Sequence, residues 1–433
     1  MGLNLKTFSL HTVVLIGLIQ AFFVIEGEFI TYVLAAVSYF LLVKIIQQLV
    51  RNTFKSKFRY RFLIDFYFVL GMLALGRGFF EAQDYWDWKN LLLNTGLVMF
   101  LPIITFIGMR EEITQKIYYY FLKYLLPASL MVFFLSATSN NTDGFARFLS
   151  PFYFIIIFFP YIPPKWKLIV VIVAAASIFS DTAARSNIIR ILAAFGIMSL
   201  YYFRSFINVK FINGLRYFLF FAPILFFLLA VSGTFNVFKM DEYISGDYVV
   251  DKKPGNGEIG ENDFTSDTRT FIYEEVIGSG LKRGTWLIGE SAAGGYITEA
   301  FDPSDYKGSK GRQGSEVGIL NIFNYMGIIG AIIFSLIFYF ASYSYICYSN
   351  NMISKLLGLF IAFRWCYSWV EEFTNFDMNS FFLWIMVGLS FSRTFLSMNN
   401  EEMKVWIKGI FKNSTSTRPR NLQRTSLNAV KNN

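Results

Sequence analysis

The stretch SIFSDTAARSNIIRIL, residues 177–192, places one acid and two arginines between apolar runs of the chain. A charged side chain inside a membrane span costs about 3 kcal/mol, so it normally faces the interior of a helix bundle, a partner or a water-filled cavity. Asp181 and Arg185 are four residues apart and can form an ion pair that stabilises a helix end. That pair explains one arginine and leaves Arg190, one to two turns further on, unexplained.

Further charged residues are expected near the same outer face of the membrane. Arg77 closes the third apolar run, with Glu81 one turn later, and Arg364 lies inside LGLFIAFRWCYSWVEEF. Several guanidinium groups in a region of low dielectric need anions, and the apolar segments contain too few acids to pair with them all. Arginine binds phosphate oxygens in a bidentate manner, so a diphosphate is the natural ligand. An internal ion pair between Arg364 and Glu371 is the alternative.

A long hydrophilic loop carries a second pattern, TSDTRTFIYEEVIGSG. Ser266 or Asp267 is predicted to cap a short helix that ends before Gly278. Arg269 and Tyr273 share one face of this helix. An arginine in the first turn stands at the unfavourable end of the helix dipole, which indicates a role other than helix stability, although a plain surface arginine is the alternative.

The third pattern is GRQGSEVGILNIFNYMGIIG, in which Glu316 stands where the loop returns to the membrane. Gly327 and Gly330 are predicted to thin the helix that follows. A carboxylate beside arginines can accept a proton from a sugar hydroxyl. It can equally be an acid that stabilises the start of a helix through the dipole.

The composition is that of a polytopic membrane protein, because 55% of the 433 residues are hydrophobic and only 16% are charged. The net charge of +9 reflects the orientation of loops, and we expect no nucleic-acid partner. Cys347 and Cys366 lie in or beside apolar segments, so no disulfide framework is predicted. The first apolar run lacks a cleavage site and is predicted to be an uncleaved span.

An all-α fold of about twelve transmembrane helices is predicted from the apolar runs. The expected spans lie near residues 9–25, 29–50, 62–76, 91–108, 118–136, 150–162, 168–184, 187–203, 217–235, 317–340, 356–370 and 380–397.

The connections predict the orientation. The basic segments 51–61, 163–167 and 204–216 share one side with both termini, which the positive-inside rule places in the cytoplasm. The loop between the ninth and tenth spans has 14 acidic and nine basic residues and is expected outside. The segment EEMKVWIKGIFK is predicted to be an interfacial helix, with a disordered basic tail after it. The resulting regions are residues 1–238 (nine spans), 239–315 (outer loop with a short helix), 316–397 (three spans) and 398–433 (interfacial helix and tail).

The chain resembles the superfamily of O-antigen polymerases and O-antigen ligases, over roughly residues 168–345. The resemblance is carried by an arginine just outside the seventh span, an arginine that opens a helix in the outer loop, the stretch LIGESAAGGY, and a polar residue eleven positions before the first glycine of a G-x-x-G-bearing span. It implies a GT-C-like helical bundle and an inverting glycosyl transfer, without metal or cofactor, on the periplasmic face of the bacterial inner membrane. The implied substrates are oligosaccharide repeat units carried on undecaprenyl diphosphate.

Residue by residue, the resemblance aligns Arg185 and Arg269 with the diphosphate-contacting arginines of the superfamily. Glu316 occupies the position where ligases have a histidine, and the only histidine of the chain, His11, lies in the first span. This departure favours the polymerase branch. The residues expected to carry the reaction are thus Glu316, Arg185 and Arg269, and those expected to contact substrate are Arg77, Arg190, Arg312, Arg364, Tyr273 and Glu81.

The sequence therefore predicts a polysaccharide polymerase, with a chain-length regulator as a further partner. Two alternatives stay open. A ligase would transfer finished glycan to lipid A-core, and a flippase or other transporter would move lipid-linked oligosaccharide without any chemistry.

Overall fold

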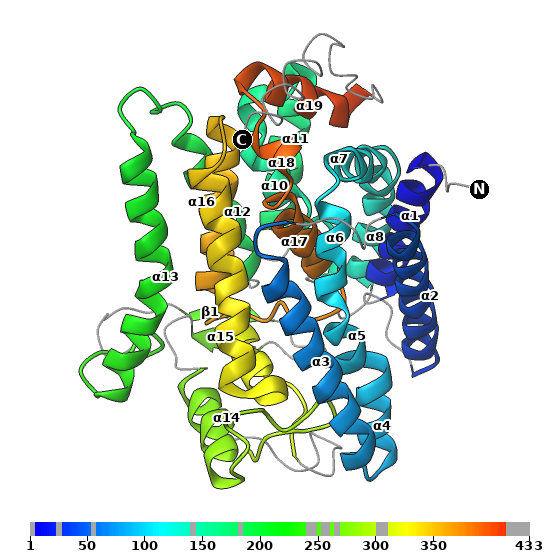
Figure 1. Cartoon of the computed structure of the whole chain (residues 1–433), viewed down its shortest axis with the longest axis vertical. Coiled ribbons are helices and arrows are strands. Elements are labelled where there is room, and N and C mark those ends of the chain that lie inside the picture. The colour runs from blue at the N-terminus through cyan, green and yellow to red at the C-terminus, as the bar shows by residue number, and fades with distance from the viewer. Residues whose placement is uncertain are drawn as a thin grey trace.

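The computed structural model describes a helical protein, with two short strands, over residues 5–22, 28–52, 58–138, 144–180, 185–239, 249–252, 260–263, 269–299 and 311–412, and of Arg185 it describes only the backbone. The start of α1 (Leu5–Phe22) and the last helix, α19 (Asn400–Lys412), lie at one end of the molecule. Helix α14 (Thr270–Lys282) lies at the opposite end (Figure 1).

The helices follow the apolar runs, but several predicted spans are composite. The first part contains α2 (Glu28–Asn52), α3 (Arg61–Glu81), α4 (Tyr85–Asn90), the π-helical turn η1 (Leu91–Thr95), α5 (Gly96–Met99), the 3-10 turn η2 (Leu101–Ile103), α6 (Ile104–Gly108), α7 (Glu111–Tyr120), a second π-helical turn η3 (Phe121–Leu125) and α8 (Leu126–Thr138). The middle part contains α9 (Gly144–Phe148), α10 (Phe152–Ile157), the 3-10 turn η4 (Phe159–Tyr161), α11 (Pro164–Phe179), α12 (Arg185–Ser199) and α13 (Val209–Val231).

The remainder of the described chain forms the hydrophilic loop before α15 and the last helices. Strands β1 (Val249–Lys252) and β2 (Gly260–Asp263) pair antiparallel. They are followed by α14 and then by α15 (Gly318–Cys347), α16 (Met352–Tyr367), α17 (Met378–Leu389), α18 (Arg393–Leu396) and α19.

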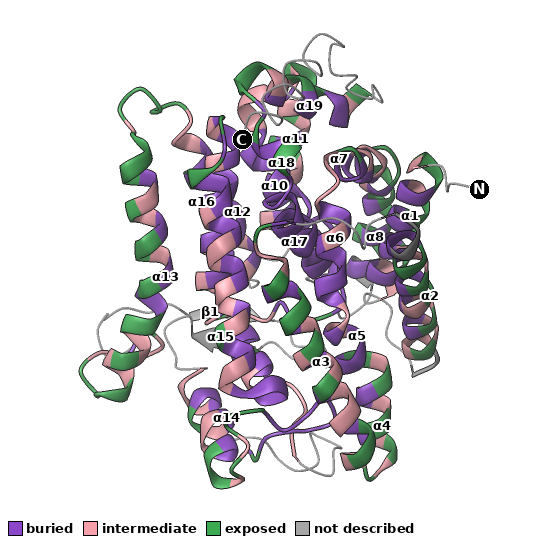
Figure 2. Ribbon diagram, in the orientation of Figure 1, coloured by how far each residue is buried: buried purple, intermediate pink, exposed green. Residues whose placement is uncertain are grey.

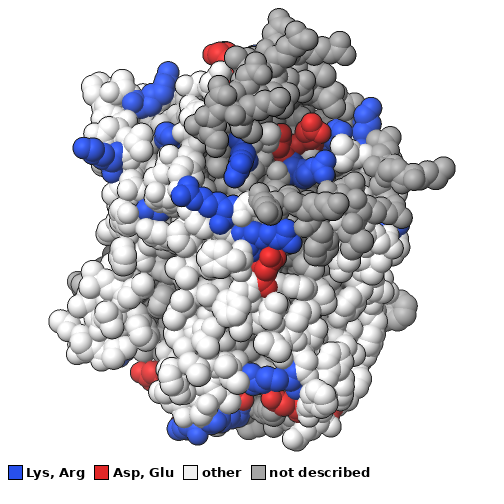
Figure 3. Space-filling view, viewed as in Figure 1, with Lys and Arg blue, Asp and Glu red and all other residues white. Residues whose placement is uncertain are grey.

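The protein is a polytopic helical membrane protein. Within the described residues, seven helical segments are long and apolar enough to cross a bilayer. Large apolar side chains stand exposed on these segments, among them Leu130, Phe134, Phe218 and Leu225, each more than half exposed. Figure 3 shows the corresponding uncharged band, with Lys and Arg gathered toward the two ends. In water such a surface would be unfavourable, whereas lipid tails cover it at no cost.

The predicted span at residues 150–162 is wrong. The structure builds this segment from the six-residue helix α10 and the turn η4, which together are too short to cross a hydrocarbon core. All six residues of α10 are buried, and Phe154 of α10 packs edge-to-face on Phe360 of α16. The apolar run reflects burial inside the protein (Figure 2) rather than contact with lipid, and hydropathy alone does not separate these two environments.

Helix α15 is broken at Gly327, which has a φ of +65° and a ψ of −167°. The segment after α14 crosses α15 at this break and bonds its freed backbone groups. The N–H groups of Ile328 and Ile329 donate to the carbonyl oxygens of Trp286 (2.9 Å) and Leu287 (3.4 Å). A Cβ atom on Gly327 would lie 2.3 Å from the carbonyl oxygen of Leu287. The prediction that Gly327 only thins this helix is therefore wrong, because the glycine breaks it and admits another segment.

Helix α19 confirms the predicted amphipathic helix but not its surroundings. Its apolar residues Met403, Trp406, Ile407 and Ile410 are buried against the protein. Gln115 of α7 donates a hydrogen bond to the carbonyl oxygen of Trp406 at 2.5 Å. The apolar face therefore packs on the helix bundle instead of entering the lipid interface.

Candidate functional site

Two segments that leave the membrane helices meet at the N-terminal end of α15. One is the linker between α16 and α17, residues 368–377, and the other is residues 311–317, which lead into α15. The N–H groups of Gly318 and Ile319 donate to the carbonyl oxygens of Glu371 (3.1 Å) and Ser368 (3.0 Å). The linker thus satisfies the first donors of α15, which a helix cannot satisfy by itself. This junction holds Arg190, Arg269, Arg312 and Glu316, four of the charged residues that the sequence singled out.

Glu316 lies between two arginines at this junction. Its Oε2 is 2.5 Å from Nη1 of Arg269, and its Oε1 is 3.6 Å from Nη2 of Arg312. Arg312 also donates to the hydroxyl of Tyr296 at 3.1 Å. The carboxylate is about half exposed, so these ion pairs are screened and contribute about 1 kcal/mol or less to stability. Their main effect is to fix where the two guanidinium groups point.

Arg269 and Tyr273 attach α14 to the linker. Nε of Arg269 donates to the carbonyl oxygen of Val370 (3.3 Å), and the hydroxyl of Tyr273 donates to that of Trp369 (2.5 Å). Burial raises the pKa of Tyr273 far above its usual value, so the hydroxyl is a permanent donor. The prediction that both residues share one face of a helix is confirmed.

The helix itself begins later and ends later than predicted. Arg269 occupies the N-cap position, with no capping hydrogen bond from its side chain, and α14 continues past Gly278 to Lys282. Ser266 and Asp267, the predicted caps, lie outside the described residues.

Arg190 reaches the same linker from α12. Its Nη2 lies 3.8 Å from Oε1 of Glu371, and its Nε and Nη2 donate to the carbonyl and hydroxyl oxygens of Ser186 at 2.9 and 2.8 Å. The side chain is only 7% exposed. Arg190 therefore contacts residue 371 while Arg269 contacts residue 370, so an arginine predicted to contact substrate and one predicted to carry the reaction converge on adjacent residues.

Arg364 is buried behind this cluster, in the last turn of α16. It donates from Nη1 to Oδ1 of Asn379 at 3.0 Å, and its Nε is among the buried atoms for which the described residues provide no hydrogen-bond partner. The positive charge of Arg190 lies close enough to repel the guanidinium group of Arg364. The expected pair between Arg364 and Glu371 is wrong, because Glu371 binds Arg190 instead.

The structure does not bring Arg77 and Glu81 into the ion pairs of this junction, and their predicted role in substrate binding stays a prediction. Arg77 donates from Nη1 and Nη2 to the carbonyl oxygens of Ile288 (3.0 Å) and Gly289 (2.7 Å), and its Nε lies 3.6 Å from Glu81. Glu81 accepts a hydrogen bond from Ser291 at 2.9 Å. Both side chains thereby fasten the loop after α14 to α3, away from the junction.

Asp181 lies outside the described residues, and of Arg185 only the backbone is described, at the first position of α12. The Asp181–Arg185 pair and the catalytic role of Arg185 therefore stay predictions.

A polar cavity of about 370 Å³ lies on the other side of the same two segments. Glu372 lines it, whereas its neighbour Glu371 faces Arg190. Among the described residues that line the cavity, Glu372 is the only carboxylate and there is no Lys or Arg. The polar lining consists of Ser38, Asn90, Asn94, Thr95, Gln313, Ser315, Asn321, Tyr325, Thr374 and Asn375.

Glu372 is held by polar neighbours at the wall of this cavity. It accepts hydrogen bonds from Asn321 and from the backbone and hydroxyl of Thr374. Burial raises the pKa of its carboxyl to about 7 against the effect of the Thr374 hydrogen bonds, and the charges of Asp377 and Glu371 add to the rise. Near neutral pH this group both accepts and donates hydrogen bonds, as recognition of a hydroxyl requires.

The sequence interpretation missed Glu372. Its adjacency to Glu371 made the pair look like one acidic turn. A usable signal was Asn321, an amide in the first turn of a strongly apolar helix, because such a group needs a polar partner when it is buried.

Among the described residues, no group of three or more His, Cys, Asp or Glu side chains has a metal-binding arrangement. Comparisons with protein-family models, with curated proteins and with solved structures gave no match.

Proposed function

We propose that the protein is a polysaccharide polymerase of the bacterial inner membrane. It joins repeat units carried on undecaprenyl diphosphate by inverting, metal-independent glycosyl transfer. The proposal includes a GT-C-like bundle of membrane-spanning helices, a periplasmic location for the long loop before α15, both termini in the cytoplasm, and a chain-length regulator as partner. Its main support is the convergence of Arg190, Arg269 and Arg312 on segments that also wall a polar cavity.

The arginine cluster suits the leaving group. Departure of a diphosphate leaves negative charge on its oxygens, and guanidinium groups fixed before the reaction stabilise that charge without reorganisation. Arg269 and Arg312 are fixed by Glu316, and Arg190 by Ser186 and Glu371. Arg185 and Arg364 are the other members of this group in the proposal.

The polar cavity suits the acceptor sugar. Amide and hydroxyl side chains recognise sugar hydroxyls without attracting the anionic diphosphate, and 370 Å³ lies within the usual size of ligand sites. Glu372 binds an acceptor hydroxyl there, so donor and acceptor approach the junction from opposite sides of the linker.

In the reaction, the acceptor hydroxyl oxygen attacks the anomeric carbon of the donor sugar, and the bond from that carbon to the diphosphate breaks. Glu316 takes the hydroxyl proton, and Arg269 and Arg312, which it holds in place, contact the phosphate oxygens. Undecaprenyl diphosphate leaves as the anion, and the glycan is longer by one repeat unit.

Purified protein in proteoliposomes, supplied with lipid-linked repeat units from the source organism, tests the proposal. We expect glycan ladders with the wild type and a single repeat unit with Glu316→Gln, and we expect Glu372→Gln to raise the KM for the acceptor. Transfer only to added lipid A-core would instead identify a ligase. Scrambling of labelled lipid without a change in glycan length would identify a flippase.

A further inference from the structure

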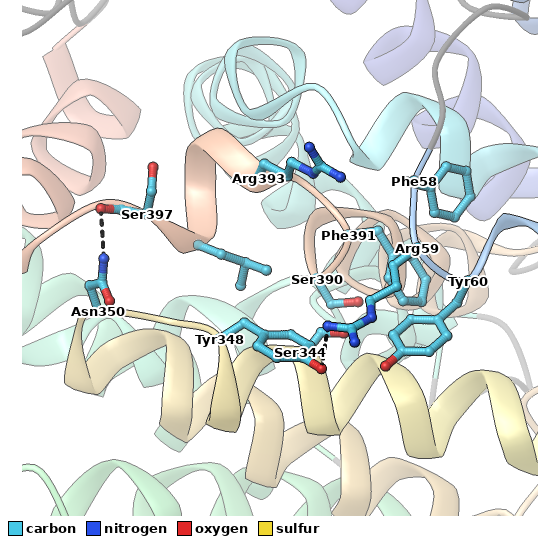
Figure 4. Close-up of a pocket in the computed structure, with 11 residues that line it drawn as sticks. Phe58, Arg59, Tyr60, Ser344, Tyr348, Asn350, Ser390, Phe391, Arg393 and Ser397 are labelled. Atoms are coloured by element: carbon cyan, nitrogen blue, oxygen red, sulfur yellow. Dashed lines mark hydrogen bonds between the residues drawn. The ribbon is translucent and has the colours of Figure 1, made fainter. Parts of the chain in front are cut away.

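A second pocket, of about 550 Å³, lies at the opposite end of the molecule from the arginine cluster. Three segments far apart in the sequence form it: the turn before α3, the end of α15, and the stretch from the end of α17 through α18 (Figure 4). Its lining residues are Phe58, Arg59, Tyr60, Ser344, Tyr348, Asn350, Ser390, Phe391, Arg393, Leu396 and Ser397.

The pocket is positively charged. Arg59 and Arg393 line it, and none of its described lining residues is acidic. Glu111, which is not among these lining residues, accepts a hydrogen bond from the hydroxyl of Ser392 at 3.1 Å. The side chain of Arg393 is exposed and forms no hydrogen bond or ion pair with any described residue. Two cations that share a pocket repel each other unless an anion lies between them.

Aromatic rings fix Arg59 and wall the pocket. Nη1 of Arg59 donates to the hydroxyl of Tyr348 at 2.6 Å, and the guanidinium stands 4.9 Å from the centre of that ring. The rings of Phe58 and Phe391 stack at 5.4 Å. The pocket therefore offers an oriented guanidinium group, an apolar wall and the hydroxyls of Ser390 and Ser397. This combination suits an anion that carries both polar and apolar parts.

The sequence that leads into Arg59 is basic. Arg51, Lys55 and Lys57 precede it in the chain, with no acid among residues 51–61. This is the side that the sequence assigns to the cytoplasm, where the membrane surface carries anionic lipids.

We propose that this pocket binds a phosphate-bearing ligand through Arg59 and Arg393. A phosphate ester accepts hydrogen bonds from both guanidinium groups, and its neighbouring polar group contacts Ser390, Ser397 and Asn350. The same chemistry is offered by the headgroup of an anionic phospholipid and by a soluble phosphate, and the experiment separates these sources. The proposal is independent of the polymerase reaction.

Native mass spectrometry of the purified protein in detergent, with dioleoylphosphatidylglycerol or dioleoylphosphatidylcholine added, tests the site. We expect the wild type to retain phosphatidylglycerol in preference, and Arg59→Gln/Arg393→Gln to retain at least about tenfold less, because the double variant loses both charge-assisted contacts to the phosphate. The matched control is Arg204→Gln/Lys210→Gln, which removes two exposed cations at the same end of the molecule but outside the pocket. This control should behave as the wild type.

A second arm uses inorganic phosphate. Its competition with phosphatidylglycerol, or its binding alone with loss in the double variant, would identify a soluble phosphate as the ligand and support the site. Equal retention of both lipids and of phosphate by the wild type and the double variant would overturn it. Arg393→Gln alone guards against misfolding, because this exposed side chain can be lost without loss of packing, and it should give an intermediate loss.

Discussion

The buried carboxyl of Glu372 makes the stability of the protein depend on pH in a specific direction. Its pKa is raised from 4.5 to about 7, chiefly by burial. The folded protein therefore keeps a proton that the unfolded chain releases. Between these two pH values the unfolded state binds fewer protons than the folded state, so stability falls as the pH rises. Glu372→Gln is neutral at every pH and removes this dependence.

The size of the effect follows from the difference between the two pKa values. The shift corresponds to about 3 kcal/mol, which is fully present below the unfolded pKa and lost above the folded one. For a chain of 433 residues this corresponds to about 3 °C in the midpoint of thermal unfolding. The glutamine also places an N–H group near the donors of Asn321 and Thr374, which lowers stability equally at all pH values. The change with pH, and not the stability at one pH, is therefore the measurement.

The assay follows thermal unfolding of the detergent-solubilised protein, by tryptophan fluorescence, from about pH 5 to about pH 9. From the lowest to the highest pH, we expect the unfolding midpoint of the wild type to fall by about 3 °C more than that of Glu372→Gln. Asp377, whose pKa is also raised by burial, is present in both proteins, so its contribution cancels to first order. Glu401→Gln, at a carboxylate that is 81% exposed, is the control and should leave the dependence unchanged. Parallel curves for Glu372→Gln and the wild type would refute the reasoning, since they would mean that this carboxyl is already ionised in the folded protein at neutral pH.

Three further predictions concern the cluster, the broken helix and the orientation. Arg269→Lys keeps the charge but cannot bind Glu316 and Val370 together, so we expect glycan extension to fall at least about tenfold with an unchanged unfolding temperature; full activity would make Arg269 structural. Gly327→Ala should lower the yield of folded protein sharply, because its Cβ meets the carbonyl of Leu287, whereas Gly196→Ala, with nothing within 4 Å, should be tolerated; equal yields by size-exclusion chromatography would contradict this. In a cysteine-free background, Lys282→Cys should react with an impermeant maleimide in spheroplasts and Arg204→Cys should not, and the reverse labelling would invert the proposed topology.

The helices were predictable from the apolar runs, but the interruptions inside them were not. A long apolar run forms a helix wherever water is absent, because the backbone N–H and C=O groups must then hydrogen-bond to one another, whether lipid or protein surrounds the helix. The π-helical turn at Leu91–Thr95 and the break at Gly327 depend on partners that lie far away in the sequence. No local pattern of residues contains that information.

The same limit applies to the charged residues. The sequence indicated that Arg190, Arg269, Arg312 and Glu316 serve one site, and the structure brings all four together around residues 368–377. The sequence could not indicate that Arg77 donates hydrogen bonds to the backbone carbonyl oxygens of Ile288 and Gly289, more than two hundred residues later in the chain. An arginine in an apolar region always needs acceptors, but its sequence neighbours do not show whether these belong to a ligand or to the protein.

The crossing of the loop over the break in α15 also bears on how the chain is made. Arg77 of α3 leaves the ribosome first, the segment that it binds follows, and the helix that this segment completes comes last. Each of these segments is therefore synthesised after the one to which it hydrogen-bonds, which suits a chain that folds from its N-terminus during translation. A nascent chain that ends before Gly327 would display the carbonyls of Trp286 and Leu287 without the donors that normally occupy them, and quality-control proteases of the membrane could use this exposed segment to detect an unfinished molecule.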